Sequence, residues 1–388
     1  MTERAEAPTG TPSPESSLAT ALARTDAGDA PAPAPRRRRR VVAVGATVVA
    51  LVAVLVVVGA RWVMADAAPA ATALELSGDI HTHDPALVVG DEGEPWYVFS
   101  TGDVRVGFGS PQVRRSTDGG RTWENAGTVW DASTRPQWVY DAVPGVQNFW
   151  APDVVEHDGT WYLYYAASTF GSNTSVIGLM TNTTLDPDDP AYAWVDQGEV
   201  VRSAAGEDNF NAIDAGVITD QDGTPWMAFG SFWGGIQLVE LAWPDGKPAH
   251  PDAEPVNIAS RIGAPDAIEA PYLVRHDGWY YLFFSRDTCC RGTDSTYNIA
   301  VGRSRSVQGP YVDDKGRDLT LDGGRSLLMS NGDMVGPGGQ SYSKGYLAFH
   351  YYDASQGGDF RLAIRRLAWT DDGWPVAWTA DELAQREG

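Results

Sequence analysis

Four segments of the sequence place a carboxyl group at the start of an apolar stretch. The four residues are Asp84, Asp153, Asp214 and Glu269, which recur at intervals of about 60 residues. A protonated carboxyl group and an ionised one can together cleave a glycosidic bond, the first as general acid and the second as general base. Several acids in one cavity also repel one another, which raises the pKa of at least one of them. This chemistry requires a fold that brings distant residues together.

Each of these acids begins a segment with the pattern of a β-hairpin. An apolar strand is followed by a Gly-containing turn and then by a strand rich in aromatic residues. A fifth segment shows the same pattern without the acid. The five segments are residues 83–102, 151–168, 212–232, 268–285 and 336–353.

The spacing of these hairpins indicates the fold class. Further strand candidates lie at 235–243 and 297–306, and long helical patterns are hard to find. A repeat of about 60 residues made of strands and turns is typical of propeller blades with about four strands each. We therefore expect an all-β, five-bladed β-propeller over residues 75–388, with a β-sandwich as the alternative. In a propeller the four acids would begin innermost strands and face one central cavity.

The N-terminal part has a different composition. Residues 1–40 contain few large apolar side chains and predict a disordered cytoplasmic tail. Five arginines at 36–40 precede an uncharged, mostly apolar run at 41–60, which predicts a transmembrane anchor over 41–63 or a cleaved signal segment. A linker follows at 64–74. The propeller would then be extracytoplasmic, held at the cell membrane through residues 41–60 or secreted.

Charge and cysteine content restrict the partners. The formal net charge of −22 argues against nucleic acid, which needs a basic surface, and leaves a neutral sugar as a ligand. The 15 Trp and 15 Tyr residues include candidates for stacking on sugar rings. The two cysteines, Cys289 and Cys290, are adjacent and lack metal-site spacing. They predict either a vicinal disulfide or two free thiols.

The short motifs within the hairpins occur in a recognisable order. They are HDP (83–85), NFWAPD (148–153), NAID (211–214), IEAPY (268–272) and FHYYD (349–353). In this order and spacing they resemble glycoside hydrolase family 43, most closely its endo-1,5-α-L-arabinanases, over about residues 75–380. The resemblance implies a five-bladed propeller and an inverting hydrolase that acts on a plant-type polysaccharide, α-1,5-linked L-arabinan.

The resemblance also implies a role for each acid. Asp84 would be the general base, Glu269 the general acid, and Asp214 the residue that orients the acid and raises its pKa. Asp153 would be structural. Candidate substrate-binding residues near these motifs are Asn148, Phe149, Trp150, Asn211, Phe232 and Tyr272.

The fifth hairpin departs from the arabinanase pattern. The resemblance implies a Gly-Pro-Gly-His run whose histidine helps to hold a metal at the channel centre, but residues 336–340 read Gly-Pro-Gly-Gly-Gln. The metal ligands are therefore unknown, and a central calcium stays open as an alternative. No cofactor is expected to be required.

Three other functions remain open. Related exo-acting members, an α-L-arabinofuranosidase or a β-xylosidase, would share the same acids. A non-catalytic glycan-binding propeller is a second class. The run STDGGRTW at 116–123 resembles the Asp-box of sialidases, for which we predict a structural role, locking a turn.

Overall fold

The computed structural model describes residues 68–387. The predicted tail, the anchor or signal segment, and the first residues of the linker lie outside this range. Within it, no helix is long and apolar enough to cross a membrane.

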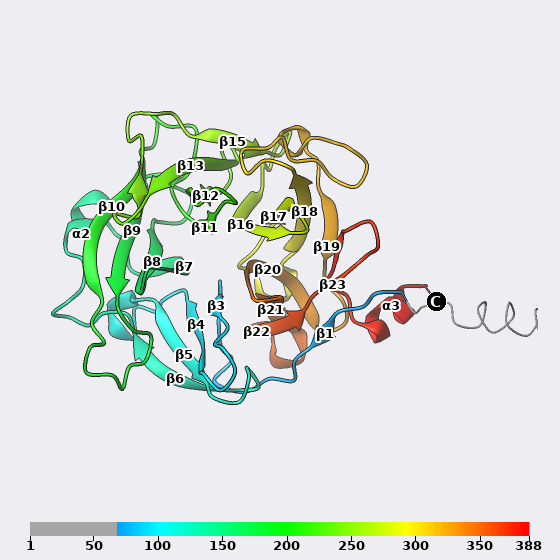
Figure 1. Cartoon of the computed structure of the whole chain (residues 1–388), viewed down its shortest axis with the longest axis horizontal. Coiled ribbons are helices and arrows are strands. Elements are labelled where there is room, and N and C mark those ends of the chain that lie inside the picture. Colours follow the sequence, from blue (N-terminus) through cyan, green and yellow to red (C-terminus); the bar gives the residue numbers. More distant parts are fainter. Residues whose placement is uncertain (1–67, 388) are drawn as a thin grey trace, which may run out of the picture. The chain divides into compact units, whose positions relative to one another are not determined.

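The β-strands form five sheets around a common centre, which confirms the predicted all-β, five-bladed propeller (Figure 1). In the first four sheets, strands follow the chain from the inside outward. The first contains β3 (Ala86–Val88), β4 (Trp96–Ser100), β5 (Gln112–Ser116) and β6 (Thr122–Thr128), with β2 (Ser77–Gly78) added parallel to β6. The second contains β7 (Phe149–His157), β8 (Thr160–Ala167), β9 (Ser175–Asn182) and β10 (Val195–Ser203).

The third sheet contains β11 (Gly216–Thr219), β12 (Pro225–Phe229) and β13 (Ile236–Ala242), with β14 (Lys247–Pro248) and β15 (Val256–Ala259) both paired to β13. The fourth contains β16 (Ile268–His276), β17 (Trp279–Arg286), β18 (Asn298–Ser304) and β19 (Arg325–Leu328). The fifth contains β20 (Met334–Ser343), β21 (Tyr346–Asp353) and β22 (Asp359–Arg366). Each of the five predicted hairpins supplies the two innermost strands of one sheet.

The outermost strand of the fifth sheet comes from the other end of the described chain. The strand β1 (Thr72–Ala73) pairs with β22, so the first described residues complete the last sheet. The ribbon β23 (Ala368–Trp369) and β24 (Pro375–Val376) follows, and α3 (Ala380–Glu387) is held by Arg365, which donates to Glu382. The short helix α2 (Trp138–Ala142) lies between the first and second sheets in sequence.

Aromatic side chains fill the spaces between neighbouring sheets. Between the first and second sheets, Phe149 packs edge-on against Trp130 and Tyr165, and all three are buried. Such pairs bury large apolar areas, which stabilises the stacking of one sheet on the next. The Asp-box has the expected structural role: Asp118 accepts hydrogen bonds from Ser116 and the backbone of Thr122, and Trp123 is buried.

A left-handed residue recurs within or just before each innermost strand. The residues and their φ angles are Asp84 (51°), Ala151 (39°), Asp214 (59°), Ala270 (51°) and Gly339 (58°). In the second, fourth and fifth sheets, strand pairing skips this residue and the next one, as at a β-bulge. Left-handed backbone is costly for residues other than glycine, and such strain collects at functional sites.

These left-handed positions correct the expected alignment of the acids. Asp84 and Asp214 occupy the equivalent position, whereas Glu269 precedes it by one residue and Asp153 follows it by two. The four acids are therefore not in register, because each bulge changes the direction in which the following side chains point.

One buried arginine fixes the chain just before Asp84. The Arg114 guanidinium donates to the Ser100 hydroxyl and the His81 carbonyl and pairs with Asp79, and its side chain is 2% exposed. We predict that Arg114→Met lowers the free energy of unfolding by about 2–4 kcal/mol, because it leaves buried partners unsatisfied.

The neighbouring Arg115 is the matched control, since its acidic partners Glu124, Asp186 and Asp188 are exposed. Arg115→Met should change stability by less than about 1 kcal/mol. Urea denaturation followed by tryptophan fluorescence compares the two variants, and equal losses would contradict the role assigned to Arg114.

Candidate active site

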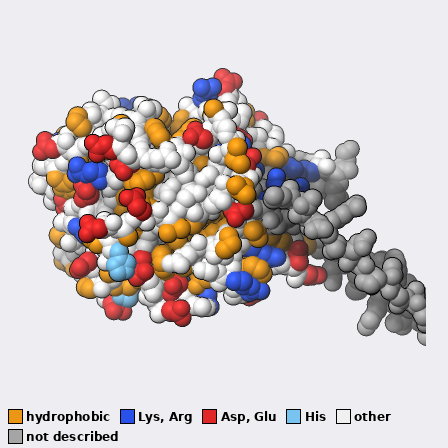
Figure 2. Space-filling view, turned by 90° about the horizontal axis from the view of Figure 1, so that it is seen from above, with side chains coloured by type: hydrophobic (Ala, Val, Ile, Leu, Met, Phe, Trp, Pro, Cys, Tyr) orange, Lys and Arg blue, Asp and Glu red, His pale blue; other side chains and the backbone are white. Residues whose placement is uncertain are grey.

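A cavity of about 600 Å³ opens where the innermost strands begin, and three of the four predicted acids line it. Asp84 precedes β3, Asp214 precedes β11, and Glu269 lies in β16. Residues far apart in sequence thus meet because the sheets are arranged in a ring. On the face shown in Figure 2, acidic side chains are spread among neutral ones rather than gathered in one patch.

Asp84 is held in the ionised form. Burial opposes ionisation, but His83, whose Nδ1 is 2.8 Å from Asp84 Oδ2, together with His350 and Thr101 lowers the pKa of Asp84 well below its usual value. The Thr101 hydroxyl donates to the same oxygen at 2.6 Å. The backbone N–H of Asp84 donates to His350 Nδ1 at 3.1 Å. An ionised carboxylate with a fixed orientation can accept a proton from water.

Glu269 has the opposite protonation preference. Burial raises its pKa above the ordinary value, and the negative charge of Asp84 adds to the shift, while hydrogen bonds from Ser231 and Tyr297 oppose it. The Ser231 hydroxyl donates to Glu269 Oε2 at 2.8 Å. A carboxyl group with a raised pKa keeps its proton to higher pH and can therefore act as a general acid.

Asp214 acts on the backbone beside Glu269. Its Oδ2 accepts a hydrogen bond from the Ala270 N–H at 3.1 Å. Burial raises the pKa of Asp214 well above its ordinary value, and the charges of Glu269 and Asp84 raise it further. Asp214 and Glu269 therefore form an interacting pair that resists the loss of both protons.

Asp153 does not line the cavity. Its side chain is buried in β7, and Oδ2 accepts a hydrogen bond from the Val217 N–H of β11 at 2.7 Å. Burial raises the pKa of Asp153 to about 6. The residue ties the second sheet to the third, in agreement with the structural role expected for it.

The six candidate substrate-binding residues divide into two groups. Trp150, Asn211 and Phe232 line the cavity, and Asn211 Oδ1 accepts a hydrogen bond from Ser175.

The other three candidates do not line this cavity. Phe149 is 0% exposed in the core between the first two sheets. Asn148 instead accepts a hydrogen bond from the Val104 N–H. Tyr272 lines a narrow channel of about 30 Å³ that Asp84 and Asp214 also line.

Two cavity residues, Phe170 and Tyr297, were not predicted from the sequence. Phe170 is 81% exposed beside Trp150, with ring centroids 5.0 Å apart. The candidate Phe232 and its neighbour Trp233 both line the cavity, and both have a left-handed backbone. Tyr297 lines the cavity near Glu269. Only an exposed aromatic residue in a polar loop, as at Phe170, could have been noticed from sequence.

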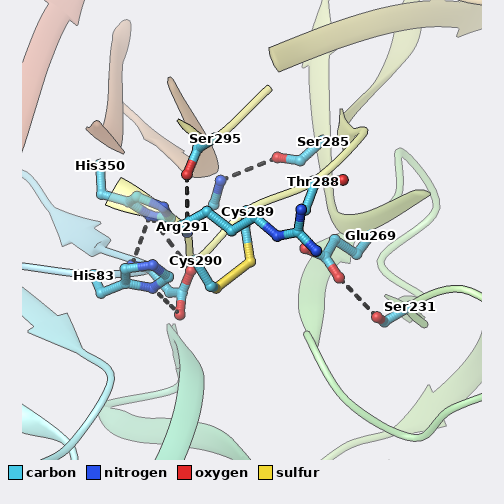
Figure 3. The surroundings of a disulfide bond; sticks show 12 residues. His83, Ser231, Glu269, Ser285, Thr288, Cys289, Cys290, Arg291, Ser295 and His350 are labelled. Carbon is cyan, nitrogen blue, oxygen red and sulfur yellow. Dashed lines mark hydrogen bonds and ion pairs between the residues drawn. A yellow bond between two sulfur atoms is a disulfide. The ribbon is translucent and has the colours of Figure 1, made fainter. Parts of the chain in front are cut away.

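The cysteines form a disulfide, which decides between the two alternatives left open by the sequence. Cys289 and Cys290 both line the cavity. Figure 3 shows the disulfide between His83 and His350 on one side and Glu269 with Ser231 on the other.

The residues near the channel centre do not fit a calcium ion. Among the described residues, His83, Asp84 and His350 are the grouping whose donor atoms lie within 4.8 Å of one another. Two of its three members offer nitrogen, whereas calcium takes six to eight oxygen ligands. The His350 Nδ1 already accepts a hydrogen bond from Asp84. A Cβ atom at Gly339 would overlap Asp84 Oδ1 and the His350 ring, so this backbone leaves no room for a histidine there.

Comparison with known proteins identifies relatives across the whole propeller. The model of the glycosyl hydrolases family 43 matches residues 80–375. The extracellular endo-α-(1→5)-L-arabinanase 1 of Bacillus subtilis is 40% identical over 81% of this chain and 94% of its own length. The extracellular exo-α-(1→5)-L-arabinofuranosidase ArbA of Cellvibrio japonicus is 39% identical over 76% and 86%. The structure of a Cellvibrio cellulosa α-L-arabinanase complexed with arabinohexaose is 40% identical, with a TM-score of 0.70, over 78% of this chain and 97% of that one.

The raised pKa of Glu269 predicts a stability effect. A carboxyl group whose pKa is higher in the folded state lowers stability as the pH rises above its unfolded-state value. Glu269→Gln should therefore raise the Tm by a few degrees at pH 8, and the difference should shrink toward pH 4.

Thermal unfolding followed by circular dichroism measures this effect. The exposed Glu207 has no ion pair among the described residues, and Glu207→Gln is the matched control with an unchanged Tm. A lower Tm for Glu269→Gln at pH 8 would contradict the assignment of a raised pKa.

Proposed function

Because the chain belongs to glycosyl hydrolase family 43, we propose that it hydrolyses α-1,5-linked L-arabinan with inversion, using Asp84 as general base and Glu269 as general acid. The observation that carries this proposal is that Asp84, Asp214 and Glu269 share one cavity with opposite protonation preferences. The names of the relatives, which include both endo- and exo-acting arabinan enzymes, support the substrate class.

The two carboxyl groups divide the reaction between them. Asp84 accepts a proton from the water that attacks the anomeric carbon, and Glu269 donates its proton to the oxygen of the leaving sugar. Asp214 holds the backbone of Ala270 and with it the acid. Both groups then exchange protons with solvent and return to their starting states. Acid–base hydrolysis of this kind requires no cofactor.

The cavity wall suits a chain of neutral sugars. Trp150, Phe170, Phe232 and Trp233 offer aromatic faces, and Ser168 and Asn211 offer polar atoms. Aromatic faces stack on the apolar faces of sugar rings, while a small number of polar groups fix their orientation. The acids in the cavity repel anionic ligands, which argues against the sialic acids of sialidase substrates.

We place the propeller outside the cytoplasm. The disulfide of Cys289 and Cys290 is typical of an oxidising compartment, and two relatives are named extracellular. The anchor or signal segment at 41–63 stays a proposal from sequence, as does membrane association through residues 41–60.

The substrate and the mode of action can be tested with debranched arabinan. We expect wild-type protein to release mixed arabino-oligosaccharides, and Asp84→Ala and Glu269→Ala to lower kcat by several orders of magnitude with the fold retained. Release of arabinose alone would assign exo action, and no hydrolysis of any pentoside would favour a binding protein. Proton NMR of the first product should show the β-anomer, since inversion of an α-linkage is expected.

The protonation states predict a characteristic pH profile. Activity should persist well below the usual pKa of an aspartate, because Asp84 stays ionised, and should fall as the pH rises through the raised pKa of Glu269.

Asp214→Asn removes the group whose ionisation competes with that of Glu269, so no second charge opposes the ionisation of Glu269, and this alkaline fall in kcat/KM should move to lower pH. A fall that stays in place, or that moves to higher pH, would contradict the proposed effect of Asp214 on the acid.

A further inference from the structure

The disulfide turn has a contact that the proposed reaction does not explain. Cys290 has a left-handed backbone with φ of 67°, and its N–H donates to the Tyr352 hydroxyl at 2.8 Å. The covalent link between adjacent side chains limits the conformations open to this peptide. The direction of the Cys290 N–H is therefore set by the turn itself, between β17 and β18.

The Tyr352 hydroxyl connects this N–H to His83 through two hydrogen bonds. A backbone N–H can only donate, so Tyr352 Oη accepts from Cys290 and has its own hydrogen free. That hydroxyl lies 2.9 Å from His83 Nε2. If the tyrosine donates to Nε2, the neutral imidazole carries its hydrogen on Nδ1, because the bond at one ring nitrogen sets the tautomer.

The Nδ1 hydrogen of His83 then meets the general base. His83 Nδ1 lies 2.8 Å from Asp84 Oδ2, which also accepts from Thr101. The other tautomer would place a lone pair against the carboxylate and repel it. The His83 ring is held in place by stacking on His350, with ring centroids 3.6 Å apart.

We propose that Tyr352, held by the Cys289–Cys290 turn, is a positioning residue that fixes His83 in the Nδ1–H tautomer and thereby orients Asp84. The proposal rests on the assignment of Asp84 as general base. It links the fourth sheet, which carries the disulfide, through the fifth, which carries Tyr352, to the first, where Asp84 precedes β3.

Tyr352→Phe removes only the hydroxyl and tests this relay. We expect kcat on linear α-1,5-L-arabino-oligosaccharides to fall about tenfold to a hundredfold with KM within about twofold of wild type, because the base is misoriented while the sugar contacts remain. Tyr351→Phe on the same strand is the matched control, since its hydroxyl makes no hydrogen bond among the described residues, and its kcat should be unchanged.

A double-mutant cycle separates positioning from a general structural effect. In the Asp84→Ala background, Tyr352→Phe should cause no further loss, because the residue acts through the base. Additive losses, or an unchanged kcat in Tyr352→Phe, would overturn the proposal while leaving the role of Asp84 intact. Full activity of Asp84→Ala would instead overturn the proposed function and the relay together.

Two measurements extend the test. Long-range ¹H–¹⁵N NMR of the histidine side chains should show the Nδ1–H tautomer for His83 in wild type and lose it in Tyr352→Phe, whatever the substrate. The variant with both Cys289→Ser and Cys290→Ser keeps the backbone N–H without the link, and its kcat should fall in the same direction. An unchanged tautomer in Tyr352→Phe, or wild-type kcat without the disulfide, would contradict the relay or its anchor.

Discussion

Like charges cannot all be ionised in one shielded cavity, and this constraint underlies the whole site. Asp84, Asp214 and Glu269 share a cavity, and among these three acids the neighbouring donors and histidines outweigh burial only at Asp84, where they lower the pKa. Burial and mutual repulsion raise the pKa of the other two, so they do not both ionise easily. The difference between acid and base therefore comes from the unequal distribution of hydrogen-bond donors, since the three residues have nearly the same intrinsic chemistry.

The ring of sheets supplies this unequal distribution. The same left-handed step occurs within or just before each innermost strand, yet the residue there is Asp, Ala, Asp, Ala or Gly. A common backbone thus presents different groups to one centre. The glycine of the fifth sheet is required sterically, since a side chain at Gly339 would overlap the base and the His350 ring. The energy stored in these steps is offset by the packing between sheets.

The sequence was sufficient to predict the fold and the three acids that line one cavity. Alternating strands and Gly-containing turns are local signals, so all five hairpins were found. Their spacing predicted that the sheets form a ring. The bulges were not visible, which is why Asp153 was expected to face the same cavity as Asp84, and Phe149 to face the substrate. A one-residue change in register reverses the direction of a side chain. Partners such as Ser231 and Tyr352 come from other sheets, so their contacts in the site could not be predicted from the local sequence.

The pairing of β1 with β22 has a consequence for the order in which the protein matures. The first and last sheets meet beside the base: His83 and Asp84 contact His350 and Tyr352 of β21. A ribosome delivers residue 84 long before residue 350, so the emerging polypeptide carries an incomplete base until its final quarter has been made. The protein thus becomes competent for hydrolysis only at the end of its synthesis, when the first sheet comes into contact with the last one.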